Sequence, residues 1–137
     1  MSNEQAERSF SPAVLAHFRR PLHAGVLPGG GGLVGTGRAG TVKSGVMVQV
    51  QLRVGADGHI DDVAWLAYGC PATLAACSWT AERICGKPLQ EVLAVGASDM
   101  VHALELAPVH RGRVLVVEDA LRAALDAVVD GPNGKTE

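Results

Sequence analysis

A cysteine directly followed by proline, in the stretch YGCPATLAAC (residues 68–77), is the pattern in this sequence that most suggests chemistry. Proline is favoured at the first position of a helix, so Pro71 predicts a helix that Cys70 caps. The Cys70 sulfur would then lie over unpaired amides at the positive end of the helix dipole, which favours the thiolate. The pattern therefore favours a reactive thiol, and the alternative is a small buried residue that ends a strand.

The other two cysteines fit structural roles. Cys77 shares a predicted helix face with Leu74 and Ile84, which indicates core packing. Cys85 lies beside the predicted end of the same helix and is also expected to be structural. Three cysteines without a CxxC pair do not indicate an oxidised scaffold, and at least one thiol should be free.

A cationic stretch, HRGR, comes just before the predicted terminal helix and contains His110, Arg111 and Arg113. It fits either an exposed basic loop or the cationic wall of a pocket. Charge runs are usually solvated, so these residues alone favour the exposed loop.

The elements that must position these residues begin with a short helix in SPAVLAHFRRPL, with Ser11 as its cap and Pro12 at its first position. Val14, Leu15 and Phe18 are expected to face the core. Residues 27–40 are rich in glycine and predict a mobile loop, which includes Gly35, Gly37 and Gly40. GTGRAG spells GxGxxG, but a strand pattern follows it, so a dinucleotide site is not indicated.

Alternation over residues 46–54, the turn GADG and the segment HIDDVAWLAYG predict an antiparallel hairpin. Helical spacing begins at Pro71 and ends before Gly86 and Pro88. Short helices are expected over about 89–93 and 99–104, and a final helix over 117–129. Strands followed by helices predict an α+β fold.

Length and composition predict one domain over residues 1–137, because 137 residues with 47% hydrophobic content can bury a core. The net charge of −2 comes from mixed charges without a basic run, so no nucleic-acid partner is expected. The absence of a long apolar run and of a leader pattern predicts a cytoplasmic chain without a membrane partner.

Five stretches together resemble one known family in order and spacing, namely LAHFRRPLHAG, GTGRAG, DVAWLAYGC, CGKPLQEVLAV and ELAPVHRGRVLVVEDALRAAL. They are similar to the iron–sulfur scaffold family typified by IscU and the N-terminal part of NifU, over about residues 14–128. The resemblance implies a three-stranded antiparallel sheet packed by helices, as in IscU and the related SufE-type proteins. It also implies work in iron–sulfur cluster assembly beside a cysteine desulfurase.

The ligand positions of that family are mostly changed here. The family holds its cluster with three cysteines, an aspartate and a histidine. By position, the first cysteine falls on Ser44 and the aspartate on Val46. The second cysteine is retained as Cys70, and the histidine–cysteine pair falls on Gly112 and Arg113.

These replacements exclude an ordinary three-cysteine cluster. A serine hydroxyl is too weak an acid to replace a thiolate on iron, and arginine stays protonated in proteins. An arginine beside Cys70 would instead stabilise a thiolate or a persulfide, so His110, Arg111 and Arg113 become candidate thiolate-stabilising residues. The family's LPPVK segment for a dedicated chaperone appears as LAPVH, in which Pro108 and Val109 are candidate partner-binding residues.

Three functions remain open at this stage. In the first, Cys70 accepts sulfur from a cysteine desulfurase as a persulfide and passes it on, with residues 28–40 as a mobile cover, which makes the chain a sulfur carrier. In the second, iron or a labile iron–sulfur cluster binds Cys70 together with ligands from another subunit or an external thiol. In the third, the chain is a non-catalytic module that binds the desulfurase and regulates or competes with a true scaffold. Another cluster-assembly protein is a further candidate partner.

Overall fold

Three antiparallel strands in chain order form the sheet of this computed structural model, which describes residues 10–29 and 32–130 and the side chains up to residue 128. They are β1 (Leu33–Thr41), β2 (Val46–Val54) and β3 (Ile60–Tyr68). The predicted hairpin of β2 and β3 is confirmed, and its turn is closed by a hydrogen bond from the Gly58 amide to the Gly55 carbonyl.

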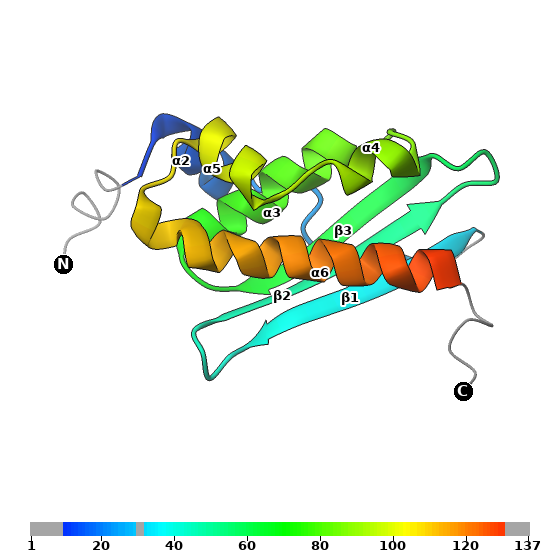
Figure 1. The fold of residues 1–137 in the computed structure, drawn as a ribbon, viewed down its shortest axis with the longest axis horizontal. Coiled ribbons are helices and arrows are strands. Elements are labelled where there is room, and N and C mark those ends of the chain that lie inside the picture. Colours follow the sequence, from blue (N-terminus) through cyan, green and yellow to red (C-terminus); the bar gives the residue numbers. More distant parts are fainter. Residues whose placement is uncertain (1–9, 30–31, 131–137) are drawn as a thin grey trace.

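Helices cover one face of this sheet (Figure 1). The side chains of β2 alternate between the two faces, and its five valine and leucine residues at even positions are buried beneath the helices. The α+β class and the three-stranded antiparallel sheet are therefore confirmed. The helical elements are α2 (Pro12–Arg19), α3 (Pro71–Ile84), α4 (Leu89–Leu93), α5 (Ala97–Leu104), the 3-10 helix η1 (Pro108–His110) and α6 (Arg111–Asp130).

The mobile loop predicted over residues 27–40 is wrong for its second half, because residues 33–41 form β1. Gly35 and Gly37 lie directly beneath α6. A Cβ at Gly37 would be 2.2 Å from the Ala124 amide nitrogen and 2.3 Å from the Ala120 carbonyl oxygen. These glycines therefore provide room for a helix backbone. Their pairing with β2 offsets the conformational entropy that glycine loses on folding.

The terminal helix also begins earlier than predicted, at Arg111 instead of residue 117. Pro108 opens the 3-10 turn of η1, and α6 follows it without an intervening loop. Arg111 and Arg113 consequently lie in the first turn of α6, at the positive end of its dipole. Cations are unfavourable at the N-terminal end of a helix. The sequence pattern therefore favoured a helix that starts at the acidic residues further along the chain.

The first helix follows its predicted boundaries but not its predicted inner face. Ser11 caps α2 by accepting a hydrogen bond from the Val14 amide, and Val14 is fully buried. Phe18 is 42% exposed, so its expected core position is wrong. The contact of α2 with α3 is made instead by His17, whose Nδ1 lies 2.8 Å from the Ser78 hydroxyl.

The segment that follows α2 pairs along the free edge of β3. The Trp65 amide donates to the His23 carbonyl, and the Gly25 amide donates to the Trp65 carbonyl. The Trp65 indole N–H also donates to the Leu22 carbonyl at 2.7 Å, which fixes this ring in the core. Within the described ranges, the helices are all too short or too polar to cross a membrane.

We expect Gly37→Ala to destabilise the chain by about 3 kcal/mol, since its Cβ overlaps the α6 backbone. Urea unfolding followed by circular dichroism measures the change. Gly29→Ala is the matched control, because a Cβ there meets nothing within 4 Å, and it should change stability by less than about 0.5 kcal/mol. Equal stability of the two variants would contradict the close approach of α6 to β1.

Candidate functional site

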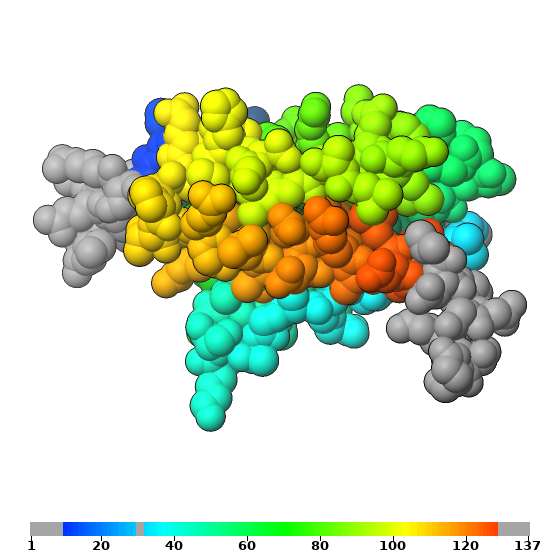
Figure 2. Space-filling view, viewed as in Figure 1, coloured from blue at the N-terminus to red at the C-terminus, as the bar shows by residue number. Residues whose placement is uncertain are grey.

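Three segments that are distant in sequence meet at one end of the sheet. The pairing of Met47 with Tyr68 places the β1–β2 turn next to the junction of β3 and α3. A Cβ at Gly40 would lie 3.0 Å from Val116, so the first turns of α6 pass over the same end. α3 and α6 both begin there (Figure 1), and the β1–β2 turn projects from the body below the start of α6 (Figure 2).

Cys70 lies at this junction, in the N-cap position of α3 that the sequence predicted. Its side chain is partly buried, and its sulfur forms no standard capping hydrogen bond. Burial alone raises the pKa of the Cys70 thiol, but the amides of Thr73 and Ala72, the Thr73 hydroxyl and the Arg113 guanidinium outweigh it. The pKa therefore falls below its usual value, which enriches the nucleophilic thiolate at neutral pH.

Thr73 is a candidate site residue that the sequence interpretation missed. Its side chain is fully buried, and its hydroxyl oxygen lies 3.8 Å from the Cys70 sulfur. Residues at the cap and three positions later face each other at a helix start, as in a capping box. The spacing of Cys70 and Thr73 was thus a signal that could have identified the pair.

Of the three predicted cationic residues, Arg113 is the one whose charge acts on Cys70. His110 does not supply a cation, because burial and then Arg113 lower the pKa of its imidazole below the usual value. Its ring stacks on Phe10 with centroids 5.1 Å apart, and its buried Nδ1 has no hydrogen-bond partner among the described residues. Arg111 is exposed, and its role as a thiolate-stabilising residue stays a prediction.

The other two thiols differ from Cys70 in their surroundings. Cys77 is buried in the core as predicted, and burial raises its pKa far above the usual value. Cys85 is partly exposed at the end of α3, where burial and the charges of Asp62 and Asp61 raise its pKa. Among the described cysteines, Cys70 is therefore the thiol whose environment favours ionisation.

The four altered ligand positions do not complete a metal site. Ser44 lies in the β1–β2 turn, where its hydroxyl donates to the Thr41 carbonyl at 2.8 Å. Val46 is buried in the core, and Gly112 is exposed without a side chain. In residues 10–29 and 32–130, no group of three or more His, Cys, Asp or Glu side chains could hold a metal ion. This donor set does not fit an iron–sulfur cluster held by one chain.

The remaining predicted site residues divide into two groups. Gly35, Gly37 and Gly40 belong to β1, so they do not form a cover that opens and closes over Cys70. Pro108 and Val109 are exposed in η1, and Val109 has 76% of its surface accessible. Their accessibility suits the predicted partner-binding role, which stays a prediction.

Comparisons with known proteins agree in one family. The model of the NifU-like N-terminal domain matches residues 9–130. The chain is 34% identical to the iron–sulfur cluster assembly scaffold protein IscU of Haemophilus influenzae, over 85% of this chain and 93% of that protein. It is 31% identical to iron–sulfur cluster assembly protein 3 of Arabidopsis thaliana, over 94% of this chain and 77% of that protein.

A solved structure shares the fold. It belongs to a putative iron–sulfur cluster assembly scaffold protein for the SUF system from Fervidobacterium islandicum. Its TM-score is 0.64 at 17% sequence identity, and the match covers 90% of this chain and 99% of the other.

We expect Thr73→Val to raise the pKa of the Cys70 thiol and to slow its alkylation at pH 7, because the variant keeps the side-chain shape and removes the hydroxyl. The pH dependence of iodoacetamide labelling, followed by peptide mass analysis, measures this change. Thr73→Ser should retain the wild-type profile. If valine and serine variants gave the same profile, the hydroxyl would have no influence on the thiolate.

Proposed function

Because this chain belongs to the family of NifU-like N-terminal domains, we propose that it serves iron–sulfur cluster assembly by carrying sulfur as a persulfide on Cys70. The observation that carries the proposal is the environment of this thiol. Helix amides, the Thr73 hydroxyl and Arg113 stabilise its negative charge, while the former ligand positions hold no second thiolate. A persulfide is an anion that the same groups can stabilise.

The proposed transfer is a thiol–persulfide exchange. The Cys70 thiolate attacks the outer sulfur of a persulfide on the donor, and a new S–S bond forms. The S–S bond of the donor breaks, and its cysteine leaves as a thiolate. The transferred sulfur keeps its charge or proton, so the exchange needs no external oxidant or reductant. Arg113 stabilises the negative charge on Cys70 before and after the exchange.

The proposed sulfur donor is a cysteine desulfurase that docks around this end of the sheet. Several exposed apolar side chains lie on the segments that meet there, namely Val42 in the β1–β2 turn, Tyr68 at the end of β3 and Val109 in η1. Such residues suit the centre of a protein interface. Lys43 and Arg111 add exposed positive charge on the same segments and would favour an acidic donor surface.

A second candidate function is that of a scaffold, which the names of the relatives favour. Cys70 would then hold iron or a labile cluster together with ligands from a second copy or an external thiol. This arrangement requires Arg113 to lie beside a metal cation, which its positive charge opposes.

We expect incubation with a cysteine desulfurase and free cysteine to add about 32 Da, one sulfur atom, to Cys70. Intact and peptide mass spectrometry measure the adduct, and dithiothreitol should remove it. Cys70→Ser should lose the adduct, whereas Cys85→Ser should keep it, because the raised pKa of Cys85 makes it a poor nucleophile. An unmodified wild-type chain beside an active desulfurase would rule out the sulfur-carrier function.

Anaerobic incubation with ferrous iron and sulfide should give no stable thiolate-to-iron absorption for the wild type, since one soft ligand is available. The double variant Ser44→Cys with Arg113→Cys returns two thiols to the ligand positions and should retain more iron and visible absorption. A stable chromophore on the wild type would favour the scaffold. A chain that binds the desulfurase but carries neither sulfur nor iron would be a regulatory module.

A further inference from the structure

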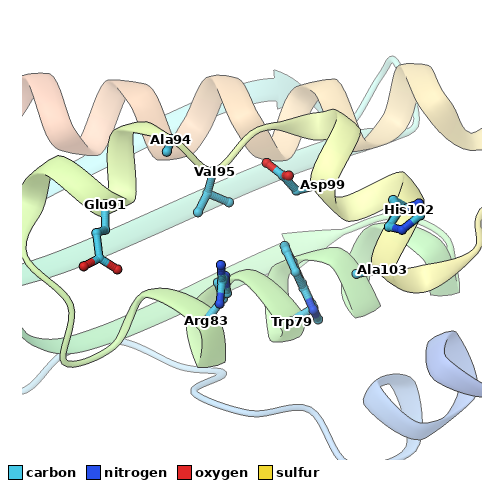
Figure 3. A pocket seen from close by; sticks show the side chains of 8 residues that line it. All are labelled: Trp79, Arg83, Glu91, Ala94, Val95, Asp99, His102 and Ala103. Carbon is cyan, nitrogen blue, oxygen red and sulfur yellow. The ribbon is translucent and has the colours of Figure 1, made fainter.

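A cleft with a volume of about 500 Å³ lies between α3 and the segment formed by α4 and α5, away from the Cys70 site. Figure 3 shows Trp79 and Arg83 on α3, and Glu91, Val95 and Asp99 on the opposite wall of the cleft. Its volume falls in the range of sites that bind small molecules.

The charged groups of this cleft are held apart from each other. Arg83, Glu91 and Asp99 are all exposed, and in the described part of the chain none of them takes part in an ion pair within 4 Å. Since Arg83 comes from α3 and the two acids come from the other wall, the fold separates the opposite charges. Each therefore remains available to a complementary charge on a ligand.

The best oriented of these groups is Asp99. Its Oδ2 accepts a hydrogen bond of 2.9 Å from the Gly96 amide, which fixes the carboxylate at the start of α5. The other carboxylate oxygen is left for a second donor. His102 follows three residues later on the same face of α5 and lines the cleft beside Asp99.

The apolar part of the cleft lies between these charges. Trp79 and Arg83 are four residues apart and therefore share one face of α3. Val95 is buried in the wall, and Ala94 and Ala103 contribute only small side chains to the lining. An aromatic face of this kind can pack against hydrocarbon and can also attract an ammonium group.

We propose that this cleft binds a zwitterion with one ammonium and one carboxylate group, as in a free amino acid or a short peptide. Arg83 binds the carboxylate, Asp99 binds the ammonium group, and Trp79 contacts the apolar side chain of the ligand. Arg83 disfavours a purely cationic ligand, and the two acids disfavour a purely anionic one. A ligand with both charges offers a carboxylate to Arg83 and an ammonium group to the acids.

This inference is independent of the proposed sulfur transfer. Trp79 is nine residues after Cys70 on the same helix, which separates the two by about 13 Å along the axis. A molecule in the cleft therefore does not occupy the position that a sulfur donor must reach.

The indole N–H signals of a ¹⁵N-labelled chain give a direct test. Trp79 lines the cleft, whereas the Trp65 indole donates to the Leu22 carbonyl in the core and serves as the internal reference. Trp79→Phe assigns the two signals. We expect titration with leucine or with the dipeptide Gly-Leu to shift the Trp79 signal and to leave that of Trp65 unchanged. The comparison of the two ligands decides between an amino acid and a peptide.

Charge requirements are tested with ligands and variants. N-acetyl-Gly-Leu amide, which carries neither charge, should bind the wild type roughly tenfold more weakly than Gly-Leu does. Gly-Leu should also bind roughly tenfold more weakly to Arg83→Gln and to Asp99→Asn than to the wild type. Asparagine keeps an oxygen that can cap α5, so Asp99→Asn should remain folded. Asp126→Asn, an exposed change of equal charge on α6, is the control and should bind like the wild type.

Two results would overturn the inference. One is an unchanged Trp79 signal at ligand concentrations of tens of millimolar, well above the dissociation constants near 1 mM of weak ligands. The other is equal binding of Gly-Leu and its blocked form, which would make the cleft an apolar surface without charge selection.

Discussion

The close approach of α6 to β1 is the constraint on which the rest of the structure depends. Gly35 and Gly37 leave no side chain between the strand and the helix, so backbone meets backbone where any other residue would separate them. This contact sets the height and direction of α6 above the sheet. Because a packed interface of this kind is not continuously deformable, it also fixes where the first turn of α6 lies, and with it Arg113.

Several positive groups give this end of the sheet its electrostatic character, and Arg113 is one of them. α3 and α6 both begin there, so the positive ends of two helix dipoles converge on the same corner (Figure 1). Arg111 and Arg113 add cations to the first turn of α6, where they cost stability unless a negative charge compensates them. The Cys70 thiolate is one such charge, and the stabilisation is mutual. A persulfide anion on Cys70 would keep this compensation, whereas a metal cation would oppose it.

The sequence predicted those features that depend on local chemistry. The alternation of β2, the Ser11 and Pro12 start of α2 and the cap position of Cys70 follow from neighbouring residues, and all three are confirmed. The strand at residues 33–41 could not be recognised locally, because its glycines are explained only by the backbone of α6, about 85 residues further along the chain. The early start of α6 was missed for a similar reason, since its first turn runs against the usual charge preference.

The difference between what packing requires and what a ligand set requires explains why the chain can match the family while its ligand positions are altered. The family match extends over the elements that build the corner, namely the sheet, the start of α3 and α6, and these depend on packing. Holding a cluster needs several soft ligands in one place, and two of the three cysteine positions of the family carry serine and arginine here. Carrying sulfur needs one ionised thiol and groups that stabilise its charge. Cys70, Thr73 and Arg113 meet this smaller requirement, which is the one that the proposed sulfur transfer makes.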